Sequence, residues 1–160
     1  VYAVEVLKIS SVEWGVANSA STFSSLVMTL LCLGFIDRIK NRNRAIALAF
    51  LVSAVGILSL ILLKGLTAAI VSLVLISLAS AFTSPSISAL LGDLTPRELR
   101  GRSMAVGNVL IRLSTAAVAP VAGFLYSTSP RIAFVIAALA TLGRAAVYLL
   151  LVREPETREE

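Results

Sequence analysis

The sequence predicts an all-α fold, a polytopic transmembrane helix bundle, and two observations carry this prediction. Of the 160 residues, 58% are hydrophobic and 14% are charged, whereas a soluble domain has about 45 to 50% apolar and about 25% charged residues. The apolar residues also form five runs, each near the roughly 20 residues that a helix needs to cross a bilayer. An ordinary soluble enzyme is therefore excluded.

The residue types that are absent or rare narrow the chemistry further. The chain has no His and a single Cys, Cys32. It therefore holds no His-based catalytic triad, no internal disulfide and no thiolate zinc site. We expect no cofactor and no metal. The net charge of +5 comes from basic residues scattered between apolar runs, which favours orientation in a lipid bilayer over binding to nucleic acid.

The five predicted spans cover residues 16–36, 45–63, 68–91, 103–126 and 132–152. Short connections separate them, so successive helices run antiparallel. Basic residues concentrate at one side of the predicted membrane, and the other side has only Lys8, Lys64 and Arg131. By the positive-inside rule the richer side is cytoplasmic. The sequence thus predicts a multi-pass protein of the cell membrane with a cytoplasmic C-terminus.

Three of the five spans carry a polar stripe, because their polar residues recur every three or four positions and so share one helix face. The first span has Asn18, Thr22, Ser25 and Thr29; the third has Ser77, Ser80, Ser84 and Ser88; the fourth has Asn108, Arg112 and Thr115. The second and fifth spans are almost wholly apolar and suit the lipid side. A single stripe is explained by close helix packing and by hydroxyls that bond to their own backbone. Three stripes on three helices favour a shared polar cavity.

Arg112 lies about ten residues into its span, roughly 15 Å along the helix and hence near the middle of the membrane. An arginine at that depth costs at least ~2.5 kcal/mol on insertion scales, so it must face water, a counter-charge or an anionic ligand. None of the five spans contains Asp or Glu. We interpret Arg112 as a cavity residue that attracts an anionic solute; a structural ion pair with another helix is the alternative.

Two more residues stand out within the spans. Arg144 lies nine residues before Arg153 and is expected to extend its guanidinium toward the cytoplasmic headgroups. Pro85 removes an amide donor from the third span and is expected to kink it.

The cytoplasmic loops carry a layer of charge. Residues 95–98 read Thr-Pro-Arg-Glu, the form of a helix start with a capping box. The layer itself consists of Asp37, Arg38, Arg42, Asp93, Arg97 and Arg100. It is either a set of solvated ion pairs, each worth at most about 1 kcal/mol, or a gate whose pairs break and re-form. The residues alone leave both interpretations open.

Several segments resemble the major facilitator superfamily of secondary transporters. GFIDRIKNRNR, residues 34–44, is similar to that family's loop signature, in which Asp37, Arg38 and Arg42 match while Leu33 and Lys40 stand at the two Gly positions. Residues 92–108 resemble the loop that leads into the family's eleventh helix. APVAG, residues 119–123, resembles the Gly-Pro turn in that helix, and LLVREPE, residues 150–156, resembles the chain terminus.

The resemblance implies that residues 1–160 are the C-terminal half of such a transporter, with the spans as helices 8 to 12. Residues 1–7 (VYAVEVL) would end helix 7, and the N-terminal half of the same chain would be missing. In the family, helices 7, 8, 10 and 11 line the cavity and 9 and 12 lie outside. The resemblance also implies alternating access. The N-terminal half is the alternative within the family.

Together these observations predict secondary active transport of a small solute, not an enzyme. The expected cavity residues are Arg112, Asn108, Thr115, Asn18, Thr22, Ser25, Ser80 and Ser84. The alternatives are a transport-inactive membrane scaffold of the same fold and a membrane-embedded transferase. The second has little support, because such chemistry needs carboxylates, His or a metal near a membrane face.

Overall fold

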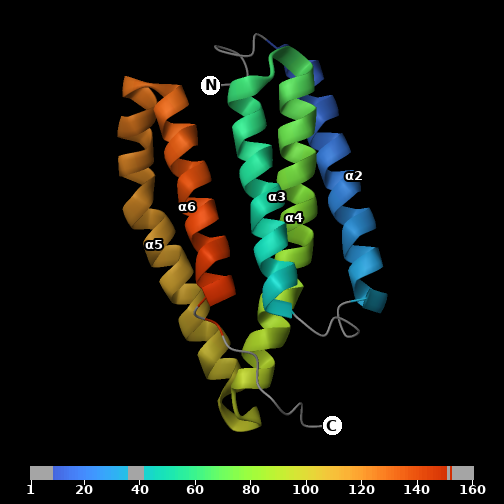
Figure 1. Ribbon diagram of the computed structural model, residues 1–160, viewed down its shortest axis with the longest axis vertical. Helices are drawn as coiled ribbons and strands as arrows, with labels where there is room; N and C mark the ends of the chain where they lie inside the picture. The colour runs from blue at the N-terminus through green and yellow to red at the C-terminus, as the bar shows by residue number, and fades with distance from the viewer. Residues whose placement is uncertain (1–8, 36–41, 151, 153–160) are drawn as a thin grey trace.

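The computed structural model describes residues 9–35, 42–150 and 152. Over these residues the chain is helical and contains no strand. The helices are α2 (Ser11–Phe35), α3 (Arg42–Leu62), α4 (Gly65–Leu94), the short 3-10 helix η2 (Arg97–Leu99), α5 (Arg100–Thr128) and α6 (Pro130–Leu150) (Figure 1). Each of the five predicted spans overlaps one of the α-helices. The predicted all-α bundle is confirmed.

Within the described ranges, four helices are long and apolar enough to cross a membrane. They are Asn43–Leu62, Gly65–Gly92, Arg97–Thr128 and Pro130–Leu150. α2 has 25 residues, but its described part is more polar, since it carries Glu13, Asn18 and a series of Ser and Thr. A membrane crossing by α2 stays a prediction.

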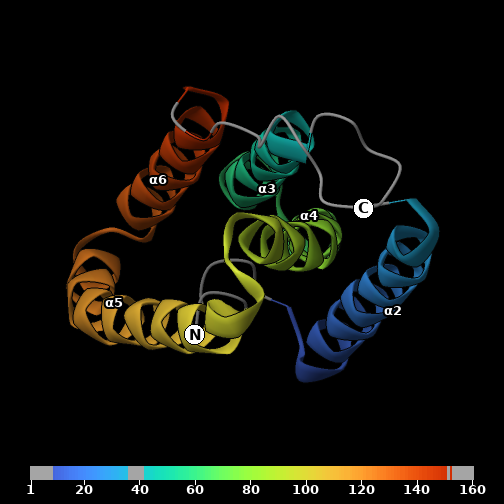
Figure 2. The same cartoon turned by 90° about the horizontal axis from the view of Figure 1, so that it is seen from below.

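The helices pack in a definite order. α4 packs along both α2 and α3, α3 packs along α6, and α5 contacts α6 and α4 over shorter stretches. Figure 2 shows α3 and α6 beside each other along one edge of the bundle, with α5, α4 and α2 following one another along the other edge. The three helices with a predicted polar stripe are thus on one side, and the two apolar helices are on the other.

Small residues make the close contacts. The fully buried positions include Ala17 in α2 and Ala68 and Ala69 in α4. At Gly56 of α3, an added Cβ would lie 3.0 Å from the Cβ of Leu75 in α4. In lipid, where apolar side chains gain little by leaving their surroundings, short side chains let helix backbones approach closely. This explains why the α3–α4 contact is built on Gly and Ala.

The helix starts differ from the prediction. At α2, the Ser10 backbone N–H donates to Glu13 Oε2 at 2.7 Å and the Glu13 N–H donates to Ser10 Oγ at 3.2 Å. This is a capping box, and the Ser-x-x-Glu pattern at 10–13 was a readable signal that the sequence analysis missed.

The capping box predicted at residues 95–98 does not form. Thr95 is instead the extended C-cap of α4, and Pro96 has ψ 143°, outside the helical range. The Leu99 N–H donates to the Pro96 carbonyl at 2.9 Å, so the backbone closes its own 3-10 turn and α5 begins at Arg100. No side chain caps η2 or α5. α5 still starts before the predicted span at residue 103, as expected.

Candidate solute site

The stripe on α2 lies beside the contact with α4, not in it. Ala17 is fully buried, and the Ser21 hydroxyl hydrogen-bonds the Ser77 hydroxyl of α4 at 2.6 Å. Asn18 and Thr22 each follow one of these residues, a step of about 100° around the helix. Asn18, Thr22 and Thr29 are exposed, and Ser25 is half-buried. The stripe therefore remains open after α2 and α4 have packed.

The serines of the α4 stripe differ in their surroundings, because one packs against α2 and the others are exposed. Ser77 is half-buried and bonded to Ser21, so it belongs to the helix contact. Ser80, Ser84 and Ser88 are exposed. They continue from Ser77 along the flank of α4 next to α2, because residues three or four apart share a helix face. The α4 and α2 stripes therefore border one another.

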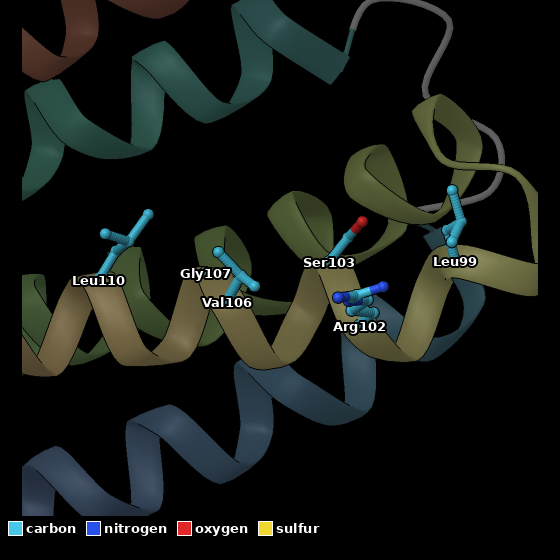
Figure 3. A pocket seen from close by; sticks show the side chains of 6 residues that line it. All are labelled: Leu99, Arg102, Ser103, Val106, Gly107 and Leu110. Carbon is cyan, nitrogen blue, oxygen red and sulfur yellow. The ribbon is translucent and has the colours of Figure 1, made fainter.

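The stripe on α5 is fully open. α5 has no buried residue, and Asn108, Arg112 and Thr115 are all exposed. Ser103 is nine residues before Arg112, which is two and a half helical turns, so the two lie on opposite sides of α5. In Figure 3, Ser103 and Leu110 point to the side where α3 lies. Arg112 therefore lies on the side of α5 opposite to Ser103.

A groove of about 520 Å³ runs along the opposite face of α5 (Figure 3). Its lining residues are Leu99, Arg102, Ser103, Val106, Gly107 and Leu110. None of the predicted cavity residues lines it. The predicted residues are spread over α2, α4 and α5, where all are exposed except Ser25, which is half-buried.

Five of the hydroxyls in the polar stripes make the same kind of hydrogen bond. Thr22 Oγ1 donates to the Asn18 carbonyl at 3.0 Å, and Ser80 Oγ donates to the Ile76 carbonyl at 2.8 Å. The same bond to the preceding turn is made by Thr29 at 2.8 Å, Ser88 at 3.0 Å and Thr115 at 2.9 Å. Each hydroxyl has one proton to donate, so its remaining outward capacity is as an acceptor. These hydroxyls bond to their own backbone, as is expected of hydroxyls in a packed helix contact. They are also exposed, as is expected of hydroxyls in a cavity.

The charged layer at the cytoplasmic loops is described only in part. Asp37 and Arg38 lie outside the described residues, as do the side chains of Arg42 and Asp93. Arg97 is exposed. Arg100 is half-buried, and its Nε donates to the Thr95 carbonyl at 3.2 Å. Arg100 thus ties the end of α4 to the start of α5.

A comparison with known protein families identifies the family of this chain. The family model of the Major Facilitator Superfamily matches residues 1–160. The chain belongs to the major facilitator superfamily. No curated protein and no solved structure gives a significant match. The resemblance seen in the loop segments is therefore confirmed for the family.

Members of the major facilitator superfamily are membrane transporters and not enzymes. A multi-pass membrane transporter agrees with the apolar helices described above.

The α3–α6 side holds polar contacts that the sequence analysis did not find. Asn43 Nδ2 donates to the Val152 carbonyl at 2.5 Å, and the Phe50 and Tyr148 rings lie 5.6 Å apart. Thr141 is buried and bonds the Ala137 carbonyl. The Phe50–Tyr148 pair joins α3 to α6, and the Asn43 bond joins α3 to the chain just after α6, whereas Thr141 bonds within α6. A pattern search within one helix gives no signal for the first two contacts, since the partner lies far away in the chain.

Proposed function

We propose that this chain is the C-terminal half of a secondary transporter that moves a small anionic solute across the cell membrane by alternating access. The N-terminal half of the same protein would close the open side of α2, α4 and α5. The solute would then lie between the two halves, near the middle of the membrane. The C-terminus is assigned to the cytoplasm by the distribution of basic residues.

Arg112 is the observation that carries this proposal. Its guanidinium is exposed on a helix that is apolar enough to cross a membrane. It shares its face with Asn108 and Thr115, on the side of α5 opposite to Ser103. A cation held at that depth attracts an anion strongly, because few water molecules compete for it.

The charged layer would form the cytoplasmic gate of this transporter. Asp37, Arg38, Arg42, Asp93, Arg97 and Arg100 would make and break ion pairs as access alternates between the two sides. The bond from Arg100 to the Thr95 carbonyl supports the view that the α4–α5 connection is held as one unit. A rigid connection lets a change at the gate reach α5, and with it Arg112.

Transport by the full-length protein in proteoliposomes tests the role of Arg112. We expect Arg112→Ala to lower the uptake of the transported anion at least tenfold, because one charge-assisted hydrogen bond contributes about 1.5 to 3 kcal/mol. Arg112→Lys keeps the charge and should retain part of the uptake. Arg144→Ala is the matched control, since Arg144 is also an exposed arginine on an apolar helix but lies on α6.

The outcomes separate the alternatives. If Arg112→Ala transports every candidate anion as the unmodified protein does, Arg112 has no binding role. If the unmodified protein gives no flux of any solute in vesicles, a transport-inactive scaffold is favoured instead.

A further inference from the structure

The groove along α5 is polar at one end and apolar at the other. Its lining residues recur every three or four positions, so they form one line along the helix. Arg102 and Ser103 lie in the first turn of α5, and the line continues through Val106 and Gly107 to Leu110. From Arg102 to Leu110 it rises ~12 Å, at about 1.5 Å per residue. A ligand that fits this groove is therefore amphipathic.

The two ends of the groove lie at different levels of the membrane. Arg112 is near the middle of its span, and Arg102 precedes it by ten residues, which is ~15 Å of helix. Half of a hydrocarbon core about 30 Å thick is the same distance. Arg102 and Ser103 therefore stand at the level of the lipid headgroups, and Leu110 lies at the level of the acyl chains.

The polar groups at the start of the groove are not engaged elsewhere. Within the described part of the chain, Arg102 makes no ion pair or hydrogen bond, and its side chain is exposed. The half-buried Ser103 hydroxyl makes no bond to the preceding turn, unlike the Thr115 hydroxyl, which donates to the Ile111 carbonyl at 2.9 Å. Both groups can therefore donate hydrogen bonds to a ligand in the groove.

The start of α5 also carries an excess of positive charge. Residues 97–102 contain three arginines and one acidic residue, Glu98. Arg100 is bonded to a backbone carbonyl, whereas Arg97 and Arg102 are exposed. Basic groups between membrane helices at the headgroup level bind the phosphates of anionic lipids. The polar end of the groove is thus complementary in charge to such a phosphate.

An anionic phospholipid uses both ends of the groove at once. Free phosphate would contact Arg102 and leave the apolar line empty. Phosphatidylcholine would fill the apolar line but would bring its own cationic group close to the arginines. A phospholipid with a net negative charge matches the charge of the first end and the apolar lining of the second.

We propose that this groove binds one anionic phospholipid from the leaflet at the start of α5. The phosphate accepts hydrogen bonds from the Arg102 guanidinium and the Ser103 hydroxyl, and one acyl chain lies along Val106, Gly107 and Leu110. α5 contacts α6 and α4 only over short stretches, so the lipid adds packing that the described helices do not supply. The groove is on the other side of α5 from the predicted solute residues, so this inference does not rest on the proposed solute.

Photo-crosslinking of the full-length protein in lipid nanodiscs tests the inference. The probe is phosphatidylglycerol with a diazirine on one acyl chain, and phosphatidylcholine with the same chain is the comparison. Peptide mass spectrometry measures the labelling of residues 99–110. We expect phosphatidylglycerol to label this segment about fivefold more, because one basic residue at the membrane surface favours an anionic lipid by about that factor.

Two arginine variants test the contact with the headgroup. Arg102→Ala should remove most of the preference for phosphatidylglycerol. Arg44→Ala is the matched control, because Arg44 is an exposed arginine at the start of α3 that does not line the groove. It should leave the preference unchanged.

Two glycine variants test the position of the acyl chain. An added Cβ at Gly107 or at Gly123 of α5 meets nothing within 4 Å, so both positions accept a larger side chain. Gly107 lines the groove and Gly123 does not. We expect Gly107→Leu to remove most of the labelling of residues 99–110 by both lipids, because the leucine fills the space of the acyl chain. Gly123→Leu should leave this labelling unchanged.

Three outcomes would overturn the inference. Equal labelling of residues 99–110 by the two lipids in the unmodified protein would show that the headgroup is not recognised. Full labelling in Gly107→Leu would show that the acyl chain lies elsewhere. No labelling of the segment by either lipid would show that another helix of the full-length protein covers the groove.

Discussion

Arg112 and Arg144 are both exposed guanidinium groups on apolar helices, and their surroundings differ. Arg112 shares a helix face with Asn108 and Thr115. Arg144 lies one turn before Tyr148, whose ring packs beside Phe50 of α3. A long side chain near the end of a membrane helix reaches the headgroups by extending along the helix. We therefore expect Arg144 to act as a membrane anchor and Arg112 to act within the solute site.

At the scale of single residues, Gly56 sets how closely α3 approaches α4. A Cβ at this position would lie 3.0 Å from Leu75 Cβ, 3.1 Å from Ile76 Cγ1 and 3.2 Å from the Ser72 carbonyl oxygen. All three atoms belong to α4, and the carbonyl is backbone that cannot rotate away. An added side chain here requires α4 to shift by a few tenths of an ångström.

We expect Gly56→Ala to lower the free energy of unfolding by about 1 kcal/mol. Overpacking a tight contact costs about 1 to 3 kcal/mol, and the better helix propensity of Ala returns up to about 1 kcal/mol. Denaturation in mixed detergent micelles measures the difference. Gly143→Ala is the control, because an added Cβ there meets nothing within 4 Å. Equal stability of the two variants would contradict the close contact.

At the scale of elements, the two Ser/Thr-x-x-Glu sequences show what a helix start requires. Ser10 and Glu13 exchange hydrogen bonds and begin α2. Thr95 and Glu98 have the same spacing, but Pro96 between them is extended with φ −53° and ψ 143°. The chain then bends into η2 before α5 can begin. Side-chain spacing alone therefore does not make a capping box; the backbone between the two residues must be helical.

The start of α2 is expected to weaken in acid. The Ser10 backbone N–H, and then the Ser10 hydroxyl, hold the pKa of Glu13 below its ordinary value of 4.5. A carboxyl whose pKa is lowered by folding stabilises the helix fully above that ordinary value, and the stabilisation is lost as pH falls through the lowered pKa. The effect is thus confined to pH below about 4.5.

Fluorescence of Trp14, the single tryptophan, measures this weakening. The backbone N–H of Trp14 donates to the Ser10 carbonyl at 3.0 Å. Fraying of the first turn therefore moves Trp14 and changes the surroundings of its indole ring. We expect an emission change below pH 4.5 that is absent in Glu13→Gln, which carries no titrating carboxyl. The same acid transition in Glu13→Gln would show that another group is responsible.

At the scale of the whole molecule, the bundle separates helices with polar stripes from helices without them. α3 and α6 pack together along one edge, and α2, α4 and α5 form the other (Figure 2). Exposed apolar residues lie on both edges, for example Val55 on α3 and Leu139 on α6 in the first edge and Phe23 on α2 in the second. Among the described residues, the exposed Ser, Thr and Asn side chains of the long helices lie on the second edge, whereas the exposed polar side chains of α3 and α6 are arginines, Arg144 among them. We expect lipid on the first edge and water on the second.

Thiol labelling of the full-length protein in membranes tests this division. In a background that lacks Cys32 and every other native cysteine of the full-length protein, single cysteines at Thr22, Ser80 and Thr115 should react with a water-soluble maleimide, because the reactive thiolate forms only where water is present. Cysteines at Val55 and Leu139 should stay unmodified although both positions are exposed in the bundle. Reaction at Val55 and Leu139 with protection of the other three would refute the division.

The helices were predictable because each depends on a property of its own segment. A run of about 20 apolar residues makes a helix in a membrane whatever surrounds it, since only a helix satisfies its backbone hydrogen bonds internally. The all-α fold, the positions of the helices and the resemblance to the superfamily follow from such local patterns. The capping box at Ser10 was equally local and was within reach of the same approach.

The faces that meet were not predictable from the sequence alone. The spacing of the serines on α4 does not distinguish Ser77 from Ser80. In the structure, however, Ser77 bonds Ser21 of α2 and Ser80 is exposed. Periodicity fixes which residues share a face of a helix, but the rotation of that helix toward its neighbours depends on how all the helices pack. The sequence by itself thus determined the helices and their polar stripes. The tertiary structure alone decided which polar groups join two helices and which remain exposed, because helix rotation depends on the packing of the whole bundle.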